Sequence, residues 1–345
     1  MRRTITWILL ALGVAAVGLS AESTPPQLEM FLHRQLGFTP LEMGDLERGQ
    51  IVVKLPATVE SREVAAFAIM RLRVPSDYYV AKFQDIVNFK KSDNVLQIGK
   101  FGNPPRLEDL ANLSLDPADI EAIRQCHLNK CDVKMPAQFI ERFMMDLDWT
   151  APNYRERANA LMREKLLEYV KSYLRGGNAE LAEYRDKSYR LRLGDEFRSL
   201  LQPAPYTYGY TPEFQSYLET FPRSRPKDSQ DFIYWSKEKF GLKPVISITH
   251  VIIYKRSGPG GTDVLIGSKG IYASHYFEAS LGLTALVHGK DPAHSYLIYL
   301  NRSRADGLRG PLSGMKRALI STSLRDGARK NMEMVRQRLE AEYHP

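Results

Sequence analysis

The amino-acid sequence predicts an α+β protein in which a curved antiparallel sheet wraps a long C-terminal helix and a large helical insertion interrupts the domain. Three observations predict this class. Strand-like segments open the chain, amphipathic helical segments fill its middle, and a series of short-linked strands leads into one long terminal helix. Strands that follow one another with short links pair antiparallel, so the last third of the chain should form a meander.

The N-terminal part, residues 22–135, carries patterns that are typical of strands. Glu63–Val74 alternates with one richer apolar face, which predicts a half-buried strand. Asp116 followed by Pro117 is a capping residue with proline at the first helical position, which predicts the start of a helix. The other elements expected here are strands at Gly49–Leu55, Asn94–Phe101 and Cys131–Met135, and a helix at Tyr78–Val87.

The middle part, residues 136–243, is predicted to be helical and to form either an insertion or a subdomain. Tyr154–Arg175 repeats apolar residues at spacings of three and four, so one apolar stripe should run along a helix until Gly176 and Gly177 stop it. Further helices are expected at 179–201, Phe214–Phe221 and Asp231–Phe240, with a proline- and tyrosine-rich loop at Pro203–Tyr210.

The C-terminal part, residues 244–345, is predicted to complete the domain with a meander and a helix. Expected strands are Val245–Lys255, Val264–Tyr272, Ser274–Val287 and Tyr296–Arg302, and the expected helix is Pro311–Tyr343. Ser274–Val287 alternates most cleanly, and we expect its His275, Phe277, Ala279 and Leu281 to point toward that helix. Ala279 and Gly282 are small, so the centre of the sheet is expected to leave space for a ligand.

The first 21 residues are predicted to be a cleavable signal peptide. Arg2 and Arg3 precede the apolar run Trp7–Val17, and small residues lead to an expected cleavage after Ala21. The run is shorter than the ~20 residues that cross a bilayer, so a retained membrane anchor is the weaker interpretation. We therefore expect an exported protein, either periplasmic or secreted.

The composition favours a solvated surface and gives no indication of nucleic-acid binding. The formal net charge is +8, and without the two arginines of the leader 46 basic residues stand against 40 acidic ones. Charges of both signs are interspersed, without the block of about five or six like charges that is typical of a nucleic-acid-binding arm. Peripheral contact with anionic lipid headgroups is the alternative that a mildly basic surface leaves open.

The sequence contains two cysteines, Cys126 and Cys131. In an oxidising compartment an isolated close pair indicates a disulfide that closes a short loop. The alternatives are two unpaired thiols, or a metal or redox site. A zinc site needs about four ligands, and of the other ligand types only His127 lies nearby. We therefore expect neither a metal nor a cofactor.

A family resemblance accompanies this pattern. The strand that leads into Arg73–Val80, followed by Phe83–Ile86, resembles the opening of the START-like, helix-grip superfamily of SRPBCC type. The terminal meander and single long helix, Ser274–Tyr343, are also similar to that superfamily. The resemblance covers about Gly49–Phe101 and Pro244–Tyr343. It implies an apolar cavity between sheet and helix that binds lipids or other hydrophobic molecules, and it implies no catalytic residue.

Six residues are expected to line that cavity: Trp235, His250, Tyr254, His275, Phe277 and Arg302. The aromatic side chains would supply apolar contact, and the histidines and Arg302 would orient a polar head, the arginine through bidentate hydrogen bonds. The structural alternative is that these side chains simply pack or pair within the fold. Glu278 faces away from His275 in a regular strand, and we expect it to be a charge exposed to solvent.

The sequence thus predicts an exported binding or carrier protein for a hydrophobic or amphipathic small molecule. One alternative is an enzyme that acts on such a ligand with His250 or His275 as acid–base; another is a structural or partner-binding envelope protein. The segment most similar to a serine-hydrolase elbow, Ile266–Gly270, has Ser268 in mid-hairpin rather than between a strand and a helix. The sequence contains no Walker-type loop, dinucleotide fingerprint or zinc-protease motif.

Overall fold

The computed structural model describes residues 24–58, 60–202, 204–209, 211–241, 243–258, 261–289, 294–309 and 313–344. The expected signal peptide, residues 1–21, lies outside these ranges. An eight-stranded antiparallel sheet forms the centre of the molecule, with its strands in the order β1-β2-β10-β9-β8-β7-β6-β3, and β4 and β5 form a separate pair. The sheet is not closed into a barrel.

The strands are β1 Val52–Lys54, β2 Glu63–Leu72, β3 Val95–Lys100, β4 Glu183–Tyr184, β5 Leu191–Arg192, β6 Ser229–Phe240, β7 Lys243–Gly258, β8 Gly261–Ala273, β9 Phe277–His288 and β10 Ser295–Ala305. The α-helices are α1 Pro26–Leu36, α2 Pro40–Glu47, α3 Ser76–Gln84, α4 Ile86–Phe89, α5 Pro117–Arg124, α6 Ala137–Asp146, α7 Tyr154–Gly176, α8 Leu193–Leu201, α9 Pro212–Thr220 and α10 Ser313–Glu342. Short 3-10 helices are η1 Leu107–Leu110, η2 Gly177–Glu180 and η3 Asp306–Leu308.

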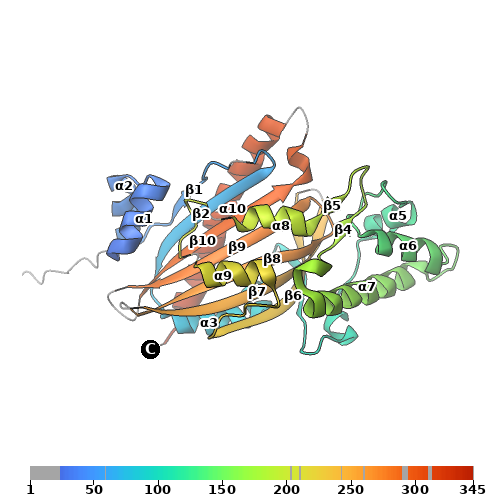
Figure 1. Ribbon diagram of the computed structural model, residues 1–345, viewed down its shortest axis with the longest axis horizontal. Coiled ribbons are helices and arrows are strands. Elements are labelled where there is room, and N and C mark those ends of the chain that lie inside the picture. Colours follow the sequence, from blue (N-terminus) through green and yellow to red (C-terminus); the bar gives the residue numbers. More distant parts are fainter. Residues whose placement is uncertain are drawn as a thin grey trace, which may run out of the picture.

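Helices cover both faces of the sheet (Figure 1). Helices α8 and α9 lie in front of the strands in that view, with α7 beside them, and α10 runs behind. The front face belongs to the larger apolar core, which includes Tyr173 of α7, Phe197 of α8 and Phe214 of α9. The rear face belongs to a second core, where Ala328 and Met332 of α10 join side chains of α3 and of the strands.

The predicted α+β class, with its antiparallel meander and its long C-terminal helix, is confirmed. Strands β7 to β10 follow one another as neighbours in the sheet, as short links between strands require. Helix α10 packs mainly on β2 and β1, at one end of the sheet. The strand β2 completes the meander by pairing with β10, so the N-terminal and C-terminal parts of the chain share one sheet.

The predicted orientation of β9 is wrong. Ala279 and Leu281 belong to the front core, with the helices of the middle part, rather than to the core of α10. The neighbouring Leu286 faces the rear core instead. A two-residue period identifies which side chains share a face, but it does not identify the helix that covers that face.

Four further local predictions are wrong, and the first is Cys131–Met135, which is expected as a strand but forms no regular element. Asp231–Phe240 is part of strand β6 instead of a helix, and β2 is buried on both faces instead of one. A strand covered on both sides has no simple alternation, and periodicity alone does not distinguish its apolar run from a buried helix. In 179–201 only η2 and α8 are helical, and the short pair β4–β5 separates them.

Cys126 and Cys131 form the expected disulfide. Their Cα atoms lie 4.5 Å apart, within the range that a disulfide spans. Both residues are buried, at the end of α5 and in the loop after it. Within the described ranges we find no group of three or more side chains arranged to hold a metal ion.

Candidate ligand site beneath helix α9

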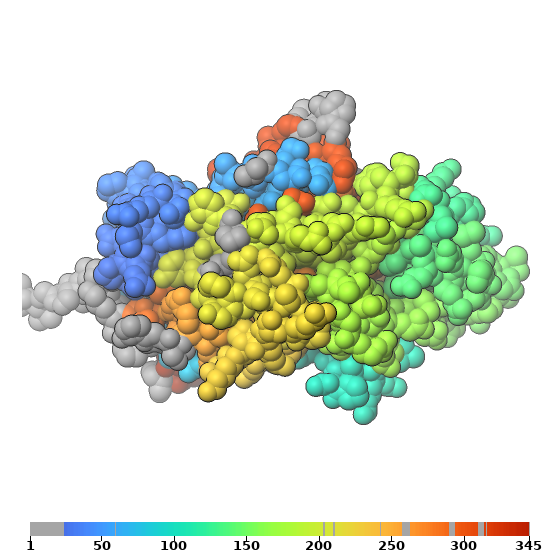
Figure 2. All heavy atoms as spheres, viewed as in Figure 1, coloured from blue at the N-terminus to red at the C-terminus, as the bar shows by residue number. Residues whose placement is uncertain are grey.

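A short segment closes over the front face of the sheet, and we call residues 204–209 and 211–221 the cover. Its helix α9 begins at a capping residue, since the Thr211 hydroxyl accepts a hydrogen bond from the backbone N–H of Phe214 at 3.3 Å. The buried side chains of the helix and its end recur at spacings of three and four: Phe214, Tyr217, Leu218 and Phe221. Figure 2 shows this face, where the atoms of α8 and α9, yellow-green and yellow, lie over the strands.

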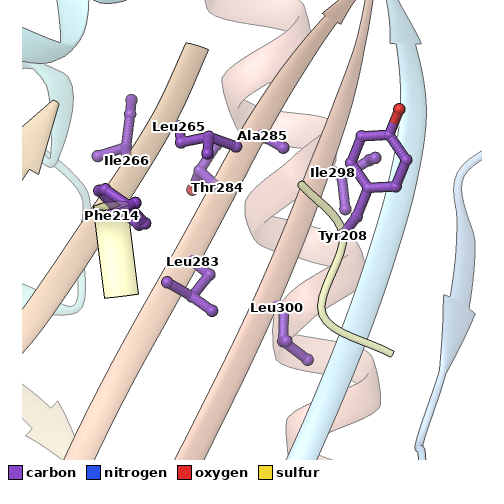
Figure 3. A pocket seen from close by; sticks show the side chains of 9 residues that line it. All are labelled: Tyr208, Phe214, Leu265, Ile266, Leu283, Thr284, Ala285, Ile298 and Leu300. Atoms are coloured by element: carbon purple, nitrogen blue, oxygen red, sulfur yellow. The ribbon is translucent and has the colours of Figure 1, made fainter. Parts of the chain in front are cut away.

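The cover encloses a small apolar hollow on the sheet (Figure 3). Its roof is formed by Tyr208 and Phe214, and its floor by front-facing side chains of β8, β9 and β10, namely Leu265, Leu283, Ala285, Ile298 and Leu300. Ile266, whose side chain belongs to the rear core, and its paired residue Thr284 border the hollow as well. The enclosed volume is about 10 Å³, room for about one water molecule. Sites for small organic ligands have volumes of roughly 300–1,000 Å³, so the hollow is closed in this conformation.

The predicted site residue His250 lies beneath the far end of the cover. It is 1% exposed, its Nδ1 is 2.9 Å from the hydroxyl of Tyr173, and its ring centroid is 4.4 Å from that of Phe221. Its Nε2 lies 3.9 Å from a carboxylate oxygen of Asp231. Burial lowers the pKa of His250 below its ordinary value, and the negative charge of Asp231 opposes that effect.

Beside His250, strand β8 places Lys269 in the interior. The residue is 0% exposed, and its ammonium nitrogen donates a hydrogen bond to the side-chain oxygen of Asn178. The same nitrogen lies 4.9 Å from the ring centroid of Phe197 and 5.7 Å from that of Tyr173. Burial lowers the pKa of Lys269 to about 7, because a charged amine is poorly solvated there.

Asn178 connects Lys269 to the cover. Its side-chain nitrogen donates to the carbonyls of Leu218 at 2.9 Å and Glu219 at 2.7 Å, and its backbone N–H donates to that of Phe221 at 3.2 Å. These carbonyls at the end of α9 have no partner within the helix, so Asn178 satisfies groups that would otherwise need water. A close approach makes this possible: a Cβ on Gly177, at φ +65°, would lie 1.7 Å from the Phe221 oxygen.

Arg302 holds the chain that leads into the cover. Its Nε donates to a carboxylate oxygen of Glu63 at 2.7 Å, and its Nη1 donates to the carbonyls of Leu200 at 2.6 Å and Gln202 at 2.9 Å. The guanidinium lies 5.8 Å from the ring centroid of Tyr206. Buried guanidinium groups need several acceptors, and here the protein itself supplies three.

The structure brings three of the six predicted site residues together under this part of the chain: His250, Arg302, and Tyr254, whose ring stacks on Phe214 at 6.1 Å. It places the other three elsewhere. Trp235 donates its ring N–H to the carbonyl of Asp109, His275 Nε2 lies 2.9 Å from Asp119, and Phe277 packs against Phe240 at 5.3 Å. None of the six lines the closed hollow.

None of the residues that line the hollow is among the six predicted ones, and neither are Lys269 and Asn178 beneath the end of the cover. Of the latter two, Lys269 has a usable signal in the sequence. Lys269 shares a two-residue period with Leu265 and Ile271, so it belongs to the apolar face of its strand. Asn178 follows the glycines that end a helix and has no local pattern that indicates its four contacts.

The prediction for Glu278 is wrong. Its side chain is fully buried, and it accepts hydrogen bonds from Arg62 at 2.6 Å and from Arg309 at 2.7 Å. These partners come from distant parts of the chain, and a local sequence pattern does not predict such long-range contacts.

Comparison of the chain with known proteins gave no match: no family model, no curated protein and no solved structure is similar to it. What this protein does is therefore inferred from its own residues.

Proposed function

We propose that this protein is an exported binding or carrier protein for a hydrophobic or amphipathic small molecule, which it holds on the sheet beneath the cover. The observation that carries the proposal is the hollow between the aromatic roof, Tyr208 and Phe214, and the aliphatic floor. Apolar side chains with a few polar groups at the margin are the usual lining of ligand sites. Polar groups of His250, Lys269 and Tyr217 lie beneath the far end of the cover, beyond the residues that line the hollow.

A ligand enters this site only if the cover moves, since the hollow has room for about one water molecule. The floor does not need to move, because β8, β9 and β10 are joined to one another by continuous antiparallel pairing. The cover has less to hold it. Its side-chain links to the sheet include the hydrogen bond from the Tyr217 hydroxyl to Asp231, at 2.5 Å.

The proposed site differs in position from the cavity that the START-like resemblance implies. That cavity would lie between the sheet and α10, whereas the hollow lies on the opposite face, beneath α9. The proposal keeps the ligand class that the resemblance implies and assigns it to the other face of the sheet.

Export is part of the proposal. The leader-like residues 1–21 and the Cys126–Cys131 disulfide support it, because disulfides persist chiefly in oxidising compartments. Within the described residues we find no helix that combines the length and the apolar character needed to span a bilayer.

The test uses the apolar fluorophore N-phenyl-1-naphthylamine and two substitutions of opposite effect. Ala285→Phe fills the hollow and should weaken binding at least tenfold. Leu300→Ala enlarges it and should strengthen binding, because apolar cavities made by such truncations take up aromatic molecules. Ala318→Phe, at an exposed position of α10, is the control and should leave the affinity unchanged.

Each outcome of this experiment decides something. If both hollow variants are folded by circular dichroism and bind the probe like the wild type, the site is not beneath the cover. If the wild type does not bind any probe, the carrier function is wrong and a structural or partner-binding role in the envelope is favoured. Mass spectrometry of an organic extract of the purified protein would identify a natural ligand.

A further inference from the structure

We propose that Lys269 and Asn178 form a proton-operated latch, which holds the cover on the sheet while Lys269 is neutral and loosens it when Lys269 takes up a proton. The latch is a conformational device within the fold. Its consequence for a ligand rests on the proposed function, but its existence does not.

Asn178 is the central residue of the latch, because every hydrogen bond of the latch is made by its side chain. The side-chain oxygen of Asn178 accepts from Lys269 of β8, and its side-chain nitrogen donates to the carbonyls of Leu218 and Glu219 in the last turn of α9. One amide group therefore joins Lys269 of the sheet to the C-terminal end of α9, beside the separate hydrogen bond from Tyr217 to Asp231. If Lys269 leaves this position to reach water, Asn178 loses its link to the sheet and α9 loses a support at its C-terminal end.

A proton on Lys269 has little to stabilise it in the closed state. The groups that face the amine are Asn178 of η2, the rings of Tyr173 of α7 and Phe197 of α8, and His250 on the paired strand β7. None of these is an anion. Among the described residues no carboxylate lies within ion-pair distance of Lys269; Asp231 of β6 lies instead beside His250, Tyr217 of α9 and Arg225.

The cation–π attraction of a ring is worth about 2 kcal/mol or more when the cation is desolvated, and both rings lie near the outer distance for such a contact. Removing an ammonium group from water costs several times more. Desolvation therefore dominates, and the closed state favours the neutral amine. In an open state, Lys269 reaches water and recovers the ordinary proton affinity of a lysine.

The direction of the pH effect follows from this difference. The closed state has a Lys269 pKa of about 7, whereas a hydrated lysine has one of 10.5. Between these values the open state binds more protons, so the open population should rise about tenfold for each unit by which the pH falls. Below about pH 7 both states are protonated, and the contribution of Lys269 no longer changes.

His250 extends the effect to lower pH. Its pKa in the closed state is also lowered, and the positive charges of Lys269 and Arg225 contribute to that, after burial itself. Below its ordinary pKa of 6.5, further opening is therefore expected as His250 takes up a proton. The two residues together make the cover tighter in alkaline and looser in acidic solution, so a ligand beneath it would be released on acidification.

The experiment measures amide hydrogen exchange of the ligand-free full-length protein at pH 7, 8 and 9, with protection factors corrected for intrinsic exchange. Amides of α9, Pro212–Thr220, report on the cover, and those of Leu297–Leu300 in β10 report on the sheet. We expect protection of α9 to fall about tenfold per pH unit from pH 9 toward pH 7 and to stay well below that of β10, whose amides exchange through global unfolding and share this pH dependence. Lys269→Met should remove the pH dependence in α9, whereas Lys330→Met, exposed on α10, should keep it.

Three results would overturn the latch. Protection of α9 that does not vary with pH is one, and an unchanged slope in a folded Lys269→Met protein is another. Equal protection factors in α9 and β10 at each pH are the third, because they would mean that the cover opens only when the whole protein unfolds. No ligand is present in this experiment, so its failure and that of the carrier function are distinguishable.

Discussion

Replacing Lys269 by methionine should stabilise this protein at neutral pH and destabilise it in alkaline solution. Methionine keeps the length and most of the volume of the side chain but removes its charge and its hydrogen bond to Asn178. The site is fully buried, so water does not screen the effect of the charge. The sign of the change therefore depends on the protonation state of the wild-type residue.

The magnitude follows from the two pKa values of Lys269, 10.5 in the unfolded chain and about 7 in the folded protein. Each pKa unit corresponds to about 1.4 kcal/mol, so burying this amine at pH 7 costs about 4 kcal/mol of folding free energy. Methionine removes this cost but leaves the oxygen of Asn178 without its partner, which costs about 1–3 kcal/mol. The net expectation at pH 7 is a gain of about 1–3 kcal/mol.

At pH 10 the wild-type amine is neutral in the folded protein and still mostly protonated in the unfolded chain, but so close to its ordinary pKa of 10.5 its burial costs less than about 1 kcal/mol. The lost hydrogen bond should then decide the outcome, and Lys269→Met should be less stable than the wild type. Urea unfolding of both proteins at pH 7 and pH 10, followed by circular dichroism, measures the difference. A stability difference between the two proteins that is the same at both pH values would refute the assignment of a neutral, buried Lys269.

Three further predictions concern single contacts. Gly177→Ala should lower the free energy of unfolding by about 2–4 kcal/mol, because the added Cβ would lie 1.7 Å from the Phe221 oxygen at a residue with positive φ. Gly327→Ala on α10, where nothing lies within 4 Å of the added Cβ, should raise it by up to about 1 kcal/mol. Thermal unfolding of both variants measures these changes. Glu278→Gln should lower the free energy of unfolding in urea by about 2–4 kcal/mol, because Arg62 and Arg309 lose a buried anion. Glu141→Gln, at an exposed position, should leave it unchanged, and equal effects of the two substitutions would contradict the burial of Glu278. Replacing Cys126 and Cys131 together by alanine should lower the free energy of unfolding by about 2 kcal/mol, and the variant should no longer be destabilised by reductant. A wild type that dithiothreitol does not destabilise would contradict this.

The order of elements was predictable from the sequence where periodicity and turns agree. Strands β7 to β10 are separated by short turns, so their adjacency follows from the chain itself. Strand β6 was not predictable in the same way, because both of its faces are buried and its run Phe232–Lys237 has no alternation. The face of Ala279 was also beyond reach, since α10 and the helices of the middle part are equally plausible covers for it.

The candidate site was predictable only in part. His250, Tyr254 and Arg302, which are expected to line a ligand cavity, lie beneath the cover or the chain that leads into it, but their partners come from segments far away in the chain: Tyr173, Phe214 and Glu63. The cover was recognised as a loop and a short helix, and its position over β8 depends on packing that no local pattern encodes. Lys269 was overlooked because a charged residue on the apolar side of a strand suggests a surface position unless its burial is known.

The most direct test of the account is a crystal structure of the protein with a brominated naphthalene, located by the anomalous signal of its bromine. The account predicts one bromine position between the floor residues Leu265, Ala285 and Leu300 and the cover, with Tyr208 and Phe214 displaced from the positions that close the hollow here. A bromine bound elsewhere on the molecule, with Tyr208 and Phe214 unmoved, would contradict the assignment of the ligand site to the sheet beneath α9.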